Sequence, residues 1–196
     1  MSKLISMIGP PASGKTTLAQ WLSGALPARL VKEDFGGNPF LAASFTGRRE
    51  LSLPAQLYFL FSRLGQLSKA TWPEDGLTVS DYGFCQDAVY ARHSLSEREM
   101  DTYGRVAGPI HDLVKPPDLV IHLDGDVDTL LARIAHRGRG YETAFHAGFL
   151  ASMRAAYEEL TAGLGCPVMY IDTGGQDLLG EGGRRELLGR IRKELA

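Results

Sequence analysis

The clearest arrangement of residues for chemistry lies near the amino terminus, where Gly9 to Thr16 read GPPASGKT. The segment matches the pattern G-x-x-x-x-G-K-[ST] and lies between a short apolar run and a helix-like stretch. Small residues let the backbone wrap around a phosphate, and a helix N-terminus attracts negative charge. Lys15 adds a cation, and the hydroxyl of Thr16 can ligate Mg²⁺. We predict a nucleotide-binding loop with these contact residues: Gly9, Ala12, Ser13, Gly14, Lys15, Thr16 and Thr17.

Two carboxylates follow short apolar runs farther along the chain, Glu33 after residues 30–31 and Asp81 after residues 77–79. A carboxylate beside an attacking hydroxyl can accept its proton during phosphoryl transfer, so we predict Glu33 as the general base. Asp81 is predicted to hold Mg²⁺ through water, together with Thr16. The alternatives are a solvated Glu33–Asp34 pair that opens a loop, and a helix-capping role for Asp81.

Arginines cluster again between residues 133 and 142, in the sequence RIAHRGRGYE. Arg133 and Arg137 lie four residues apart and share one face of a helix. Arg139 follows on a turn between Gly138 and Gly140, whose freedom suits a hinge. We predict a mobile lid, about residues 136–142, whose guanidinium groups stabilise the transferring phosphoryl group and exclude water. An exposed basic helix end is the alternative interpretation.

With three further segments, these motifs resemble the deoxynucleoside kinase family, specifically its bacterial deoxyadenosine and deoxyguanosine kinases. The segments are NPFL at 38–41 followed by Phe45, QLYFL at 56–60, and DAVYA at 87–91. The resemblance runs in family order from the phosphate loop to the last predicted strand. It implies ATP-dependent phosphorylation of the 5′-hydroxyl of a deoxynucleoside to give its monophosphate, a reaction of nucleotide salvage.

The resemblance also assigns residues to the deoxynucleoside. Gln56 makes paired hydrogen bonds to the nucleobase edge, which suits an amide that donates and accepts side by side. Glu142 binds the sugar 3′-hydroxyl. The full set of predicted substrate residues is Glu33, Phe45, Gln56, Tyr82, Asp87, Tyr90 and Glu142.

The chain departs from the family pattern at three positions. Thr46 and Phe149 each replace a tyrosine near the sugar, whereas Tyr82, where an arginine is common, fits the Asp-Tyr pair of bacterial members. Ala88 replaces the arginine that usually follows the base-contacting aspartate. The small side chain of Ala88 leaves room, which favours a purine base.

The elements that must position these residues can be traced from apolar runs at residues 4–8, 30–31, 77–79, 119–123 and 168–171. Several runs lack polar alternation, as expected for strands that are covered on both faces. Helices are predicted to begin near Gly14, Leu53, Ser96, Val127, Thr143 and Glu181. This order predicts an α/β protein with a five-stranded parallel sheet. The resemblance implies one domain over residues 1–196, with the three-layer fold of P-loop kinases and the arginine-rich lid.

Binding residues should then follow the carboxyl ends of the strands. The last run leads into a loop at residues 172–177, where we expect the donor base to lie.

The composition limits the classes of binding partner that we expect for this protein. The formal net charge of −2 gives no global attraction to nucleic acid or to an anionic membrane, so we expect neither as a partner. The two cysteines have no metal-ligand or redox spacing, and the N-terminus lacks the features of a signal peptide, so we expect a cytoplasmic protein. The resemblance implies a homodimer.

Two alternative functions stay open at this point. One is a kinase for another small acceptor, such as a nucleoside monophosphate. The other is a GTP-binding switch, although the chain lacks the guanine-recognition motif Asn-Lys-x-Asp.

Overall fold

The computed structural model describes residues 1–174 and 180–195. Its centre is one five-stranded sheet in the order β2-β3-β1-β4-β5. Every pairing is parallel, which confirms the predicted sheet. The strands are β1 (Lys3–Ile8), β2 (Arg29–Val31), β3 (Leu77–Ser80), β4 (Leu119–Asp124) and β5 (Val168–Asp172).

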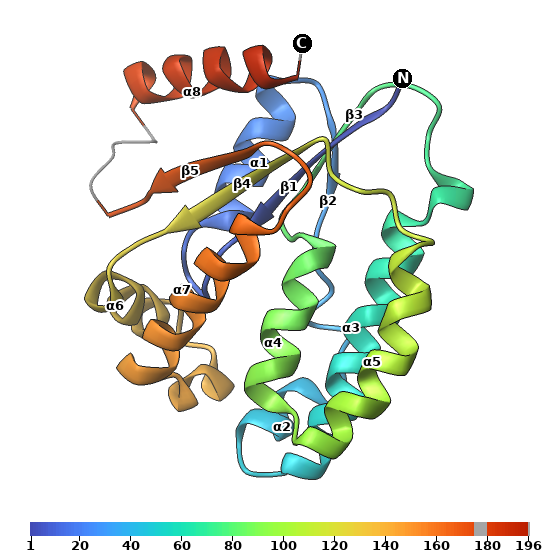
Figure 1. Cartoon of the computed structure of the whole chain (residues 1–196). Helices are drawn as coiled ribbons and strands as arrows, with labels where there is room; N and C mark the ends of the chain where they lie inside the picture. Colours follow the sequence, from blue (N-terminus) through green and yellow to red (C-terminus); the bar gives the residue numbers. More distant parts are fainter. Residues whose placement is uncertain (175–179, 196) are drawn as a thin grey trace.

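Helices cover both faces of the sheet, as Figure 1 shows. They are α1 (Lys15–Ala25), α2 (Leu41–Phe45), α3 (Ser52–Leu67), α4 (Asp87–Ser94), α5 (Glu97–His111), α6 (Val127–Arg137), α7 (Ala147–Ala162) and α8 (Glu181–Glu194). Short 3₁₀ turns are η1 (Arg49–Leu51), η2 (Lys69–Thr71), η3 (Phe84–Gln86) and η4 (Gly140–Ala144).

The alternation of side chains along β1 explains the three layers. Ile5 and Met7 pack with apolar residues of α1 and α8 on one face of the sheet. Leu4 points to the other face and packs with α3, α4 and α5, while Ile8 on that same face packs with α4 and α7. Because the central strand is buried on both sides, apolar residues occur on both of its faces, with Ser6 as a buried polar exception.

The starts of α5 and α7 test the helix starts predicted from the sequence. The predicted start of α5 at Ser96 is confirmed by a capping box, in which the Ser96 backbone N–H donates to Glu99 Oε2 over 2.9 Å. The predicted helix at Thr143 is wrong by several residues. Residues 140–144 form η4, and α7 begins at Ala147 because His146 Nδ1 accepts the Phe149 N–H over 3.2 Å. Helices α2 and α4 were not predicted.

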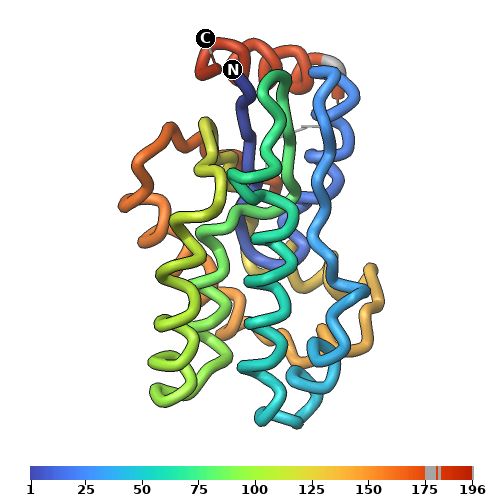
Figure 2. The backbone as a smooth tube through the Cα atoms, turned by 90° about the vertical axis from the view of Figure 1, so that its right-hand side faces the viewer, coloured from blue at the N-terminus to red at the C-terminus, as the bar shows by residue number. Residues whose placement is uncertain are grey.

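The layered fold brings the carboxyl ends of the strands together at one end of the sheet, opposite the two chain termini (Figures 1 and 2). Helices α3, α4 and α5 extend beyond the sheet on this side. Residues 175–177 of the expected donor-base loop lie outside the described residues. None of the described helices is long and apolar enough to cross a membrane.

Candidate active site

The loop between β1 and α1 has the backbone shape that its small residues predict. Gly9 and Gly14 adopt positive φ angles of 140° and 96°. A Cβ atom at Gly9 would collide with the carbonyl oxygen of Leu123, so strand β4 also requires glycine there. Gly14 forms the left-handed N-cap of α1 and directs the helix N-terminus toward the loop.

Lys15 is folded back on this loop. Its Nζ donates to the carbonyl oxygens of Gly9 and Pro10 over 2.7 and 2.8 Å. Burial lowers the pKa of Lys15 to about 8, although the carboxylates of Glu33 and Asp81 oppose that shift. A phosphate that replaced the carbonyl oxygens would favour the charged ammonium.

A cavity of about 600 Å³ opens in front of the loop. Its wall is formed by the phosphate loop, the ends of the strands, helix α3 and the lid. The lining includes most of the residues singled out from the sequence: Ala12, Ser13, Gly14, Lys15, Thr16, Thr17, Glu33, Phe45, Gln56, Asp81, Tyr90, Arg133, Arg137, Arg139 and Glu142. Positions far apart in the chain therefore meet at one edge of the sheet.

Asp81 connects the phosphate loop to Glu33. Its Oδ2 accepts a hydrogen bond from Thr16 Oγ1 over 2.7 Å, and its Oδ1 accepts the Glu33 backbone N–H over 2.8 Å. A hydroxyl and a carboxylate in contact supply the oxygen ligands that Mg²⁺ prefers. No cluster of three or more His, Cys, Asp or Glu side chains that could hold a metal occurs among the described residues.

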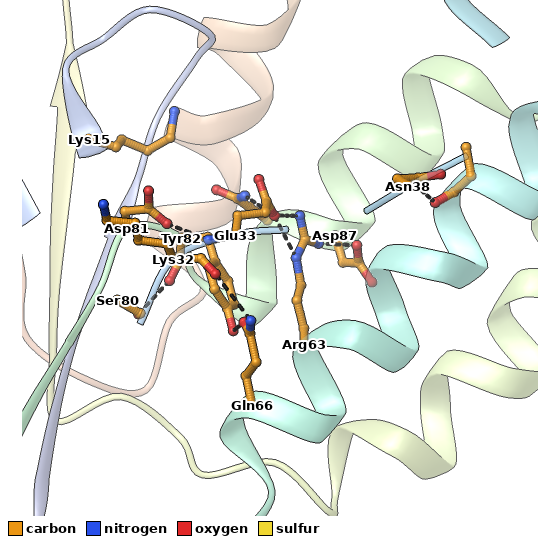
Figure 3. A network of polar contacts seen from close by, with 12 residues as sticks. Lys15, Lys32, Glu33, Asn38, Arg63, Gln66, Ser80, Asp81, Tyr82 and Asp87 are labelled. Atoms are coloured by element: carbon orange, nitrogen blue, oxygen red, sulfur yellow. Dashed lines mark hydrogen bonds and ion pairs between the residues drawn. The ribbon is translucent and has the colours of Figure 1, made fainter. Parts of the chain in front are cut away.

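Glu33 belongs to a buried polar network with Arg63 and Asp87 (Figure 3). The Glu33 side chain is 4% exposed, and its Oε1 accepts hydrogen bonds from Arg63 Nε, over 2.8 Å, and from Arg63 Nη2. Arg63 Nη1 bonds to Asp87 Oδ1, and Asp87 Oδ2 accepts from Tyr103 Oη over 3.0 Å. Burial opposes the charge of Arg63, but the Asp87 and Glu33 carboxylates raise its pKa above the ordinary value.

Gln56 has one satisfied and one unsatisfied amide atom. The residue is 4% exposed, and its Nε2 donates to Ser94 Oγ over 3.1 Å. Its Oε1 is buried and has no hydrogen-bond partner among the residues that the structure describes. An unpaired buried acceptor is costly, so this oxygen is suited to a ligand that donates a hydrogen bond.

The lid arginines are held by protein groups. Arg137 donates from Nε and Nη2 to the two oxygens of Glu142, over 2.9 and 2.6 Å. Arg139 Nη1 lies 3.5 Å from Glu142 Oε1, and the guanidinium stacks 5.2 Å from the Phe35 ring centroid. Gly138 takes the left-handed conformation that ends α6.

Arg133, one helical turn earlier, contacts a different part of the site. It donates to the side chain and backbone oxygens of Thr173 over 2.8 and 2.7 Å. It therefore ties α6 to the loop after β5.

Three of the predicted site residues do not line the cavity. Gly9 supports the loop from behind through the Lys15 contact. Tyr82 is fully buried and donates to Gln66 Oε1 over 2.6 Å, so the structure does not bring it to the substrate side. Asp87 lies behind Arg63 and reaches the cavity only through that side chain.

The residues that depart from the family pattern also lie outside the cavity lining. The Thr46 hydroxyl bonds to the Ala42 carbonyl, and Phe149 stacks on Phe145. Ala88 is exposed, so its small side chain does not enlarge the cavity. The prediction that the small side chain of Ala88 leaves room for a purine base is therefore wrong.

The role of Arg63 in this network was not predicted from the sequence. The signal that could have found it is its position on α3, because Gln56, Phe59 and Arg63 follow a 3-4 spacing on the buried face. An arginine on an apolar helix face requires buried counterions, and carboxylates at strand ends are the nearest candidates.

The family model for deoxynucleoside kinases matches residues 5–195, nearly the whole chain. The chain belongs to the deoxynucleoside kinase family. It is 27% identical over 157 residues to the deoxyguanosine kinase of Bacillus subtilis, covering 79% of this chain and 76% of that protein. It is also 27% identical over 189 residues to the deoxyadenosine/deoxycytidine kinase of the same organism, covering 92% and 87%.

A solved structure supports the same fold. The deoxyadenosine kinase from M. mycoides, with bound dCTP, superimposes with a TM-score of 0.80 at 20% identity, covering 97% of this chain and 99% of that one. The predicted fold and enzyme class are thus confirmed. As a deoxynucleoside kinase, the enzyme takes a phosphate donor and a deoxynucleoside. The switch protein and the monophosphate kinase are not supported.

Proposed function

We propose that the enzyme transfers the γ-phosphoryl group of Mg·ATP to the 5′-hydroxyl of a purine deoxynucleoside. The observation that carries this proposal is the single cavity in which the phosphate loop, Glu33, the unpaired oxygen of Gln56 and the lid arginines all converge. These groups match the two ends of a transfer reaction, a polyanionic donor and a neutral acceptor with a hydroxyl at one end and a base at the other.

The donor side follows from charge. The loop N–H groups, Lys15 and the lid arginines Arg137 and Arg139 together bind the triphosphate. Thr16 and Asp81 would hold Mg²⁺, which neutralises charge on the β- and γ-phosphates when bound. As phosphates enter, Arg137 and Arg139 exchange part of their contact with Glu142 for phosphate oxygens and exclude water from the reaction.

The acceptor side is built around Glu33. Its Oε1 is occupied by Arg63, while Oε2 accepts no hydrogen bond within the described part of the chain. Oε2 therefore takes the proton of the 5′-hydroxyl as the oxygen attacks the phosphorus. Glu142 becomes available to the sugar 3′-hydroxyl when its arginines turn to phosphate.

Base recognition rests on Gln56, with Asp87 acting through Arg63. The unpaired Gln56 Oε1 accepts a hydrogen bond from the base edge, and the Nε2 group can donate beside it. Both purines and cytosine offer a donor there, so this contact alone does not select a purine. The preference rests on the relatives, which include deoxyguanosine and deoxyadenosine kinases from Bacillus subtilis, Dictyostelium discoideum and Lactobacillus species.

The test is a substrate panel with purified enzyme, Mg·ATP and each of the four common deoxynucleosides, with dAMP and dGMP as control acceptors. We expect 5′-monophosphates from deoxyadenosine and deoxyguanosine, with kcat/KM about 10-fold or more above the pyrimidine nucleosides, a difference of about 1.4 kcal/mol. EDTA should abolish turnover and excess Mg²⁺ restore it. A pyrimidine preference would refute the purine assignment, and phosphorylation of dAMP or dGMP alone would refute the acceptor class.

A further inference from the structure

We infer that Arg63 is a positioning residue that fixes the Glu33 carboxylate, so that one oxygen is held by the protein and the other faces the acceptor hydroxyl. The inference rests on the proposed role of Glu33 as general base. Three donors converge on the same oxygen, Glu33 Oε1: Arg63 Nε, Arg63 Nη2 and, at 3.4 Å, Gln86 Nε2. Figure 3 shows the second oxygen pointing away from the guanidinium.

Arg63 can hold Glu33 in place because the Arg63 side chain is itself fixed by ring contacts and by an ion pair. Its side chain is 3% exposed and its guanidinium carbon lies 5.2 Å from the Phe59 ring centroid and 5.5 Å from that of Tyr82. Nη1 bonds to Asp87, which Tyr103 holds in turn. The planar fork thus bridges two carboxylates on different elements, one after β2 and one at the start of α4.

Glu33 needs such a partner. It lies two residues beyond the end of β2, where its backbone N–H donates to Asp81 and its carbonyl oxygen accepts the Phe35 N–H, and neither contact fixes the side chain. A flexible carboxylate at a strand end samples many rotamers, whereas a general base must stay within hydrogen-bond reach of one proton. Tyr82, the residue after Asp81, has no charge to offer and its hydroxyl is directed to Gln66. Arg63 fills this role from α3 instead.

The same network links the two halves of acceptor recognition. Gln56 and Arg63 lie on the same buried face of α3, and Arg63 contacts both the general base and Asp87. A helix that carries a base-contacting amide and the support of Glu33 places the base and the 5′-hydroxyl at a set distance. Arg63 therefore acts on the chemical step through Glu33, beyond any direct effect on binding.

The first test compares R63K and R63Q in single-turnover phosphoryl transfer at saturating ATP and deoxynucleoside. R63Q should lower the rate about 100-fold, the scale of a 1 Å misplacement, with the KM for ATP changed less than about 3-fold. R63K keeps a cation beside Glu33 but lacks the planar fork, so it should recover only part of that loss. If R63Q raises only the KM for the deoxynucleoside and leaves the rate unchanged, Arg63 is a binding contact and the inference is wrong.

The second test asks whether Arg63 acts through Glu33. On an E33Q background, R63Q should lower the residual rate by less than about 3-fold, because the group it positions is gone. A full additive loss would overturn the inference. E33Q itself tests the proposed function separately: if E33Q alone retains the wild-type rate, the assignment of the general base fails whatever Arg63 does.

Removal of Arg63 alone leaves two buried carboxylates without their counterion, so R63Q is paired with a variant of balanced charge. R63Q/D87N keeps the net charge of the three-residue network at −1, as in the wild type, whereas D87N, which retains the arginine, brings it to 0. R63Q/D87N and D87N differ only at residue 63, and the charge-matched comparison is that of R63Q/D87N with the wild type. We expect R63Q/D87N to be slower than D87N by about 30-fold or more in single turnover. Equal rates in the two folded variants would contradict the inference.

Discussion

At the residue scale, the site is recognisable by the polar atoms that the protein leaves without a partner. In the described part of the chain, Gln56 Oε1 is buried and unpaired, and the hydrogen bonds to the Glu33 carboxylate all go to Oε1. Proteins pair most buried polar atoms internally, so such atoms mark where a ligand completes the network. The assignment of Gln56 and Glu33 to the acceptor site was possible from the sequence. Which oxygen is free depends on Arg63, an interaction across 30 residues that no local motif encodes.

Replacement of Gln56 by alanine tests the nucleobase contact. Q56A should lower kcat/KM for the preferred deoxynucleoside about 10- to 100-fold, because one lost hydrogen bond that leaves a buried group unpaired costs about 1–3 kcal/mol. The KM for ATP should stay within about 3-fold. Steady-state kinetics with each substrate varied in turn provide the measurement.

The matched control for Q56A is Q20A, which removes an exposed glutamine from α1. It should behave as wild type. An equal loss for all four deoxynucleosides and for ATP would show that Gln56 supports the fold and does not read the base.

His122 on β4, away from the main cavity, is a second buried residue with unpaired polar atoms. It is 2% exposed, both ring nitrogens lack partners within residues 1–174 and 180–195, and its ring centroid lies 5.2 Å from that of Tyr170. Burial lowers the pKa of His122, and nearby Lys15 and Arg154 add to this effect against Asp124 and Glu158. The folded state therefore holds the neutral ring, while the unfolded chain binds a proton near the ordinary pKa of about 6.5.

Stability should thus fall as pH drops below about 6.5, because the unfolded state then binds more protons than the folded state. H122F removes this dependence and two unpaired nitrogens, and a neighbouring cavity of about 460 Å³ gives the ring room. We expect the Tm of H122F to exceed that of wild type by about 2–4 °C at pH 7.5, with a larger gap at pH 5.5. Calorimetry at both pH values checks this, and a gap that stays constant or shrinks at pH 5.5 would contradict it.

At the element scale, the lid rests on α2 through aromatic side chains. Phe45 at the end of α2 stacks on Tyr141, with ring centroids 6.1 Å apart, and packs edge-on against Phe145 at 5.0 Å. These contacts connect a helix near the acceptor site to the element that covers the phosphates. The sequence predicted the lid arginines and their hinge but missed α2, because a five-residue helix is too short to show a clear period.

F45A should loosen this contact without touching the phosphate loop. An aromatic pair contributes about 0.5–1.5 kcal/mol, so the KM for ATP should rise about 2- to 12-fold as the closed lid becomes less favourable. Limited proteolysis should cut faster between residues 138 and 140 in F45A than in wild type. The control F61A truncates a phenylalanine on α3 that is 53% exposed. The account of the lid is wrong if F45A and F61A have the same KM for ATP and the same cleavage rate.

At the scale of the whole molecule, the fold follows from sequence more completely than the site does. Apolar runs, breaks and the phosphate loop were sufficient for five parallel strands and a three-layer fold, since these features are local. The strand order β2-β3-β1-β4-β5 places β1 at the centre, and β3 and β4 flank it. This order brings Thr16, Asp81 and Leu123 together. Contacts such as Glu33 with Arg63, or Phe45 with Tyr141, needed the folded chain to be seen.

The central claim is that Glu33 accepts the proton of the 5′-hydroxyl inside this cavity. The most direct measurement is single-turnover phosphoryl transfer by E33Q, with both substrates saturating and their Kd values determined separately by calorimetry. The exposed-site variant E74Q serves as control. We expect a rate lowered about 10²- to 10⁴-fold for E33Q, with both Kd values within about 3-fold of wild type and E74Q unaffected. An E33Q rate within about 3-fold of wild type would contradict it.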